Sequence, residues 1–133
     1  MVVTALRVTI AEDSVLLREG LTQILRGAGM AVDAAYDNAG DLLRRVASVP
    51  PDVAIIDIRL PPTHTDEGMR AALKIRQQHP GVAVLVLSQY VEVGLAMQLL
   101  SDSAEGVGYL LKDRIADVAD FVEAIRRVAS GGS

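Results

Sequence analysis

Short apolar runs alternate along the chain with longer segments in which apolar residues recur at helical spacing. The apolar runs, rich in valine and isoleucine, predict strands over Leu6–Ala11, Ala31–Tyr36, Val53–Asp57, Val82–Ser88 and Val107–Leu111. The periodic segments predict helices near Ser14–Arg26, Asn38–Ala47, Glu67–Gln78, Glu92–Leu100 and Ile115–Ala129. Strand and helix therefore alternate along the whole sequence.

This alternation implies crossover connections and a parallel sheet with helices on both faces. The runs Val53–Ile56 and Val82–Leu87 are nearly all apolar, which is typical of strands buried on both sides. A length of 133 residues suits one hydrophobic core. We therefore predict an α/β protein with a flavodoxin-like doubly wound fold, a five-stranded parallel sheet in the order 2-1-3-4-5 and five helices.

Composition narrows the class of protein. Half of the residues are hydrophobic and 23% are charged, which favours a packed core over disorder. No apolar run approaches the roughly 18 residues of a membrane span, and the first residues do not resemble a signal peptide, so we expect a cytoplasmic protein with no membrane partner. The absence of cysteine excludes disulfides, thiolate metal sites and a thiol nucleophile.

The charge pattern gives no sign of a nucleic-acid surface. The net charge is −4, and the only adjacent basic pairs are Arg44-Arg45 and Arg126-Arg127. Such pairs are more typical of solvated helix faces than of phosphate clamps. We expect that this chain by itself does not bind DNA.

Polar side chains stand where four of the predicted strands end, and ligands of open parallel sheets bind at that edge. Glu12 and Asp13 follow the first strand, Asp57 ends the third, Ser88 ends the fourth and Lys112 follows the fifth. These strands are neighbours in the predicted order. The side chains are therefore expected to converge on one pocket.

Three clustered carboxylates repel one another unless a cation neutralises them. Mg²⁺ prefers oxygen ligands, whereas zinc prefers the sulfur and nitrogen ligands that a chain with no cysteine and only His64 and His79 scarcely offers. A carboxylate beside Mg²⁺ can attack phosphorus and form an aspartyl phosphate. Lys112 and Ser88 could then contact the phosphoryl oxygens.

Together these residues resemble the receiver domain of two-component response regulators over almost the whole chain. The similar motifs are Glu12-Asp13, Asp57 after an apolar strand, Ser88 after another, and Lys112 within Gly108–Asp113. The resemblance implies phosphorylation by a sensor histidine kinase, and a signalling protein rather than an enzyme.

The same resemblance assigns roles to individual residues. It implies that Asp57 accepts the phosphoryl group and that Mg²⁺ is bound by Asp13, Asp57 and the carbonyl of Arg59, with Glu12 acting through the water shell of the ion. Ser88 and Lys112 would contact the phosphate. Tyr109, three residues before Lys112, would be the switch aromatic that turns inward when Ser88 moves, repacking the surface of the fourth helix, fifth strand and fifth helix.

The segment Gly108–Asp113 and the Gly131-Gly132 ending are similar to receivers of LuxR-type transcriptional regulators. This similarity implies a receiver domain over residues 1–130 and, at 131–133, the start of a linker to a helix-turn-helix DNA-binding domain absent from this chain. DNA binding and control of transcription would depend on that domain.

Two features depart from the usual receiver pattern. The loop 59–68 after Asp57 is long, and we expect it to cover the site or to be mobile. Gln89 is bulky where many receivers have a small residue, so both features bear on phosphodonor access. We expect no role for His64 and His79, which both lie in predicted loops.

Several alternatives remain open at this point. Glu12-Asp13 could simply cap the first helix. The apolar arc of the fifth helix covers roughly half its circumference, and either the first helix covers the excess or the arc is a homodimer face. The chain could also be a pseudo-receiver that takes no phosphate. A phosphohydrolase is disfavoured, because the residues after Asp57 offer no second aspartate as general acid and the chain is too short for a substrate-binding cap.

Overall fold

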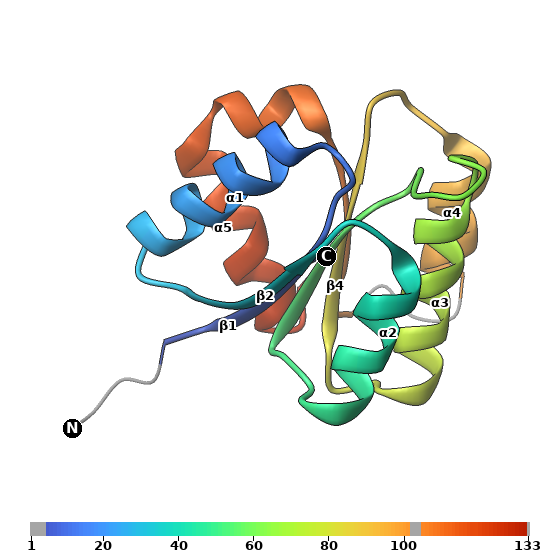
Figure 1. Cartoon of the computed structure of the whole chain (residues 1–133), viewed down its shortest axis with the longest axis horizontal. Helices are drawn as coiled ribbons and strands as arrows, with labels where there is room; N and C mark the ends of the chain where they lie inside the picture. Colours follow the sequence, from blue (N-terminus) through green and yellow to red (C-terminus); the bar gives the residue numbers. More distant parts are fainter. Residues whose placement is uncertain (1–4, 102–104, 133) are drawn as a thin grey trace.

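The computed structural model describes residues 5–101 and 105–132, and within them the chain forms one five-stranded sheet with helices on both faces (Figure 1). The strands are β1 (Arg7–Ala11), β2 (Ala31–Tyr36), β3 (Val53–Asp57), β4 (Ala83–Ser88) and β5 (Val107–Leu111). The helices are α1 (Val15–Gly27), α2 (Ala39–Ser48), α3 (Glu67–Gln78), α4 (Val93–Leu100), the 3-10 turn η1 (Lys112–Ala116) and α5 (Val118–Ala129). All neighbouring strands are parallel and the order is β2-β1-β3-β4-β5, which confirms the predicted flavodoxin-like fold.

Local signals in the sequence explain where several helices begin. The Ser14 side chain accepts a hydrogen bond from the amide of Leu17 at the start of α1. Asn38 caps α2 by accepting from the amide of Asp41 at 2.8 Å. Such caps satisfy amide groups that the first turn of a helix leaves unpaired.

The predicted start of the fifth helix at Ile115 is wrong. Residues Lys112–Ala116 form a 3-10 turn, and α5 begins at Val118 because Asp117 caps it by accepting from the amide of Asp120. Ile115 is nevertheless buried. The turn therefore continues the apolar spacing of the helix, which is why periodicity alone merged the two.

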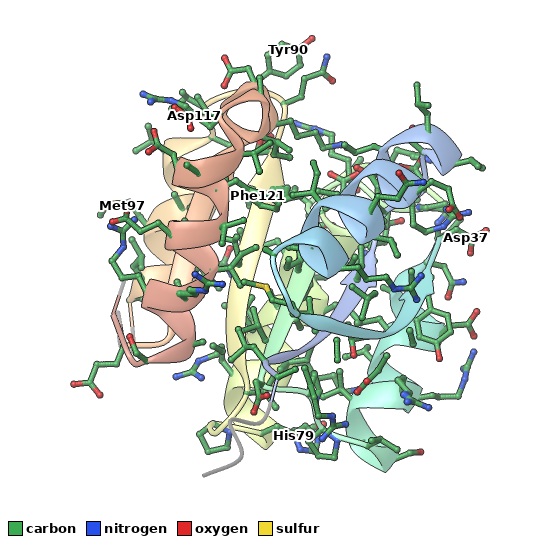
Figure 2. All side chains as sticks on the ribbon, turned by 90° about the vertical axis from the view of Figure 1, so that its left-hand side faces the viewer. Asp37, His79, Tyr90, Met97, Asp117 and Phe121 are labelled. Atoms are coloured by element: carbon green, nitrogen blue, oxygen red, sulfur yellow. The ribbon has the colours of Figure 1, made fainter. Side chains whose placement is uncertain are left out.

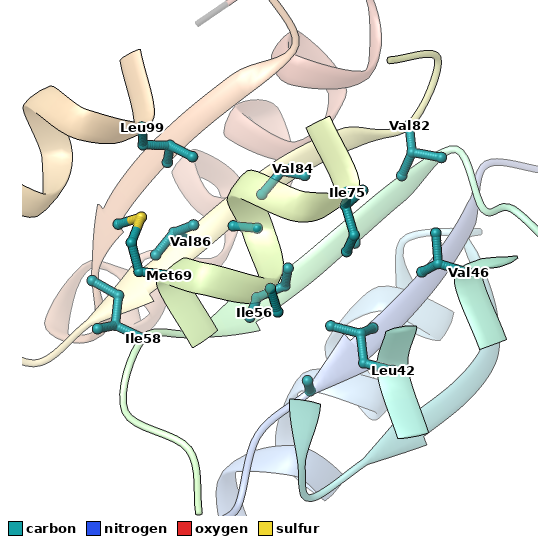
Figure 3. Packing of buried hydrophobic residues seen from close by; sticks show 14 of the residues in the cluster. Leu42, Val46, Ile56, Ile58, Met69, Ile75, Val82, Val84, Val86 and Leu99 are labelled. Atoms are coloured by element: carbon teal, nitrogen blue, oxygen red, sulfur yellow. The ribbon is translucent and has the colours of Figure 1, made fainter. Parts of the chain in front are cut away.

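The sheet divides the hydrophobic core into two layers. Helices α2, α3 and α4 cover one face, where Leu42, Val46, Met69 and Ile75 belong to one buried cluster with residues of the sheet (Figure 3). Every residue of β3 and β4 is buried, as expected for strands covered on both sides.

Helices α1 and α5 lie together on the other face (Figure 1). Leu21 and Leu25 of α1 share a buried cluster with Phe121 and Ile125 of α5. The two helices thus contribute to one buried cluster, which agrees with the expectation that α1 covers part of the apolar arc of α5. Val118, at the start of α5, remains 46% exposed.

One side chain links the segments that precede β4 and β5. The guanidinium of Arg76 donates to the carbonyls of Pro80, Val82 and Glu105 at 2.8 to 2.9 Å.

Gly132, expected at the start of a linker, donates its amide to the carbonyl of Arg127 and accepts from the amide of Gly106. Ser133 lies outside the described residues. None of the helices in the described part of the chain is long and apolar enough to cross a membrane.

Candidate functional site

The carboxyl ends of β1, β3 and β5 bring the predicted charged residues together. One carboxylate oxygen from each of Glu12, Asp13 and Asp57 lies within 4.8 Å of the others. Lys112 Nζ lies 2.9 Å from Glu12 Oε1 and 3.1 Å from Asp57 Oδ2. The strand order therefore produces the convergence that the sequence predicted.

The acid pair after β1 does more than cap a helix. Ser14 is the N-cap of α1, whereas Glu12 is fully buried and directed at Lys112. The amide of Ser14 donates to the other Glu12 oxygen at 3.2 Å, and Arg18 donates to the Glu12 carbonyl at 2.8 Å. These contacts fix Glu12 on the site side of the loop.

The electrostatics of the cluster follow from burial and mutual contact. Burial raises the pKa of Glu12 to about 7, against the opposing hydrogen bond from Lys112. Burial alone would also raise the pKa of Asp13, but hydrogen bonds with Glu12 and His64 hold that pKa below its usual value. Burial acts to lower the pKa of Lys112, yet its contacts with Glu12 and Asp57 outweigh this and raise it. One lysine thus contacts two of the three carboxyl groups.

A hard divalent cation suits this donor set. Carboxylate oxygens are the ligands that Mg²⁺ prefers, and the cluster offers three of them within a small space. Arg59, whose carbonyl is the fourth predicted ligand, follows Asp57 closely, and its amide lies 3.3 Å from Asp57 Oδ1. The residues present therefore fit Mg²⁺.

Asp13, Asp57 and Lys112 line a pocket of about 240 Å³, whereas the buried Glu12 is not part of its lining. Asp57 is only 4% exposed. The lining residues are Asp13, Asp57, Ile58, Arg59, His64, Ser88, Gln89 and Lys112. Gln89 is exposed and lies on the rim.

The predicted switch residues Ser88 and Tyr109 both contact the segment between β4 and α4. Ser88 Oγ lies 2.6 Å from the carbonyl of Tyr90 and 3.1 Å from Glu92 Oε2. The Tyr109 hydroxyl donates to the same Tyr90 carbonyl and accepts from the amide of Glu92, both at 3.1 Å. Glu92 also forms an ion pair with Arg59.

Sequence reasoning missed Glu92 as a site residue, because it read this position only as the start of a helix. Glu92 in fact joins Arg59, which lines the pocket, to Ser88 at the end of β4. No spacing rule predicts such a bridge between two strand ends. The sequence signal was limited to an acidic residue four positions after Ser88.

His64, for which we expected no role, contacts a residue of the predicted site. His64 Nε2 lies 3.0 Å from Asp13 Oδ2, and the side chain lines the pocket. The long loop 59–68 therefore lies beside the site. The only signals in the sequence were the length of this loop and the presence of a histidine in it.

The loop is held by the first residue of α3. The Glu67 carboxylate accepts from the amide and hydroxyl of Thr63 at 2.7 and 2.6 Å, and from the amide of Thr65 at 3.1 Å. These hydrogen bonds lower the pKa of Glu67 to about 2. The next residue, Gly68, packs so closely that an added Cβ would lie 1.7 Å from the Asp57 carbonyl oxygen.

Comparison with known proteins places this geometry in a family. The family model of the response regulator receiver domain matches residues 8–126. The transcriptional regulatory protein LnrK of Bacillus subtilis (strain 168) is 32% identical over 128 residues, which are 96% of this chain and 55% of that protein. The chain thus spans about half the length of the curated relatives it matches.

Solved structures of response regulators have the same fold as this chain. A LuxR-family DNA-binding response regulator from Staphylococcus aureus superposes with a TM-score of 0.77 at 25% identity, covering 93% of this chain and 98% of that one. A LuxR-family two-component response regulator from Aurantimonas sp. SI85-9A1 gives a TM-score of 0.80 at 25% identity, covering 97% and 88%. The chain belongs to the response regulator receiver domain family.

Proposed function

We propose that this chain is a phosphorylation switch whose phosphoryl acceptor is Asp57. The observation that carries the proposal is the contact of Lys112 Nζ with both Asp57 and Glu12, beside a cluster of three carboxyl groups. A buried carboxylate with an adjacent fixed cation and space for a metal ion has what an aspartyl phosphate requires.

The transfer reaction uses groups that are already in place. An oxygen of Asp57 forms a new bond to phosphorus, while the bond from phosphorus to the donor nitrogen or oxygen breaks and its electron pair leaves with the donor. Lys112 compensates part of the phosphoryl charge. Asp13, Asp57 and the Arg59 carbonyl would hold Mg²⁺, with Glu12 acting through water, and the ion would supply the remaining positive charge.

Ser88 links this event to the surface. Its hydroxyl contacts Tyr90 and Glu92, and on phosphorylation we propose that it turns to a phosphoryl oxygen instead. The segment that it leaves is the one to which Tyr109 is also bonded. Phosphorylation would thereby loosen that segment and change the surface of α4, β5 and α5.

The whole protein is proposed to be a transcriptional regulator of the LuxR type. The relative LnrK is named a transcriptional regulatory protein, and this chain matches only 55% of it. Residues 1–130 would be the receiver, 131–133 would lead to a DNA-binding domain, and a sensor histidine kinase would supply phosphate in the cytoplasm. The chain acts in this scheme as a stoichiometric acceptor and not as an enzyme.

Intact mass spectrometry tests the proposal. The chain is incubated with Mg²⁺ and acetyl phosphate, beside Asp57→Asn and a control variant, Asp120→Asn, altered on the exposed face of α5. We expect one phosphoryl group on the wild type and on the control, and none on Asp57→Asn. No addition to the wild type, with acetyl phosphate or with a cognate kinase, would indicate a pseudo-receiver.

A further inference from the structure

The loop after β3 presents His64 from a fixed backbone. His64 has a φ of 55°, in the left-handed region that residues other than glycine rarely adopt. Its amide donates to the carbonyl of Leu60 at 3.0 Å. On either side of it, Thr63 and Thr65 are bonded to the carboxylate of Glu67. An unusual backbone conformation that is held from both sides is typical of functional positions.

The imidazole of His64 reaches across the site to a residue 51 positions away. Its Nε2 atom lies 3.0 Å from Asp13 Oδ2. Both side chains are accessible at the pocket rim, with exposed fractions of 52% for His64 and 32% for Asp13. Because neither side chain is buried, close packing does not force them together. The loop conformation places the imidazole beside Asp13.

We propose that His64 is a positioning residue that holds the Asp13 carboxylate in the orientation that binds Mg²⁺. An Nε2–H donated to one oxygen of Asp13 leaves the other oxygen available to the ion and prevents rotation of the carboxylate. Hydrogen bonds of this kind commonly orient metal ligands, and their loss weakens metal binding by about 10-fold to 100-fold. The inference rests on the proposed function, because it assigns a residue to the metal site of that switch.

The test compares Mg²⁺ affinities, measured by following amide chemical shifts during titration with MgCl₂. In His64→Ala the donor is lost, and we expect the dissociation constant to rise about tenfold. In His64→Gln the side-chain amide can occupy the place of Nε2, so we expect most of the affinity to return. His79→Gln is the matched control, because His79 lies at the opposite end of the molecule from Tyr90 (Figure 2), whose carbonyl contacts Ser88 of the site.

A second variant acts through the backbone. Glu67→Gln keeps the imidazole but weakens the hydrogen bonds that fix the loop, so we expect a smaller loss of Mg²⁺ affinity than in His64→Ala. Thermal unfolding of each variant, recorded in parallel, shows that the compared proteins are folded.

The outcomes separate this inference from the proposed function. If the wild type binds Mg²⁺ and takes phosphate at Asp57, but His64→Ala binds Mg²⁺ as well as or better than the wild type, the inference is overturned and the proposed function stands. If His64→Gln is as weak as His64→Ala, the role of His64 as a donor to Asp13 is refuted. If the wild type does not bind Mg²⁺, both fail together.

Discussion

Two segments lie beside the site of Asp57, namely loop 63–67 and the segment between β4 and α4. Each is organised around one glutamate, and the two glutamates have different partners. Glu67 accepts hydrogen bonds from Thr63 and Thr65, which belong to its own loop. Glu92 instead binds Arg59 and Ser88, two residues that line the pocket.

The difference indicates which of the two segments can respond to phosphate. Thr63 and Thr65, the partners of Glu67, are not among the residues that line the pocket, so the proposed phosphorylation should leave their hydrogen bonds in place. The partners of Glu92 are a hydroxyl and a guanidinium that an incoming phosphoryl group would attract. Under the proposed function, we therefore expect loop 63–67 to keep its place and the segment between β4 and α4 to be released.

The largest expected effect comes from changing Gly68, which packs closely against the Asp57 backbone. In Gly68→Ala the new Cβ would lie 1.7 Å from the Asp57 carbonyl oxygen, so the backbone must shift. We expect the free energy of unfolding to fall by about 3 kcal/mol or more, measured by urea denaturation. The control is Gly81→Ala, where an added Cβ meets nothing within 4 Å, and it should change stability by less than about 1 kcal/mol. Equal losses in the two variants would contradict this account.

The next effect is the pH dependence of the stability that Glu67 contributes. Because the folded pKa of Glu67 is about 2, below its ordinary 4.5, its carboxylate stabilises the folded state fully above pH 4.5 and progressively less as pH falls toward 2. Glu67→Gln should therefore unfold several degrees below the wild type at pH 7. The difference should shrink between pH 4.5 and about 2, as followed by circular dichroism. A difference that is constant over this range would show that the carboxylate charge does not matter.

A smaller effect is expected from changing Glu92, in the segment between β4 and α4. Glu92→Gln weakens the hold on Ser88 and Arg59 and removes a negative charge from the pocket rim. We expect acetyl phosphate to modify Asp57 about threefold to fivefold faster, which corresponds to roughly 1 kcal/mol. The time course is followed by intact mass, with Glu123→Gln as control because Glu123 is exposed and forms its ion pair with Arg127, also on α5. A rate that is unchanged or slower would mean that Glu92 does not oppose phosphorylation.

The smallest effect should come from Tyr109→Phe. This variant loses only the hydroxyl contacts with the Tyr90 carbonyl and the Glu92 amide, each worth about 1 kcal/mol or less. We expect faster hydrogen exchange at the Glu92 amide and an unchanged rate of phosphorylation. Unchanged exchange at that amide would show that the segment is held by Ser88 and Arg59 alone.

The sequence predicts the sheet because each strand has its own apolar run and these runs recur along the chain. The apolar runs of β3 and β4 identify doubly covered strands, and the strand order then places Asp57 and Lys112 at one edge. The predicted roles of these residues remain predictions, although the geometry brings them together.

What the sequence could not predict depends on loop conformation. The contact of His64 with Asp13 requires one backbone conformation, at a φ of 55°, within a loop that has no periodicity. The bridge of Glu92 to Arg59 joins loops after two different strands. The start of α5 was misplaced because Ile115 in η1 has the same apolar spacing as the helix that follows.

The shared carbonyl of Tyr90 also has a spectroscopic consequence. The chain contains three tyrosines and no tryptophan, so its ultraviolet emission is not masked by indole and arises from phenol rings alone. Two of those rings, on Tyr90 and Tyr109, belong to residues joined by the hydrogen bond from the Tyr109 hydroxyl to the Tyr90 carbonyl. Hydrogen bonding of the phenol hydroxyl changes tyrosine emission, so the unmodified protein carries its own optical reporter at the junction between its pocket and its outer surface.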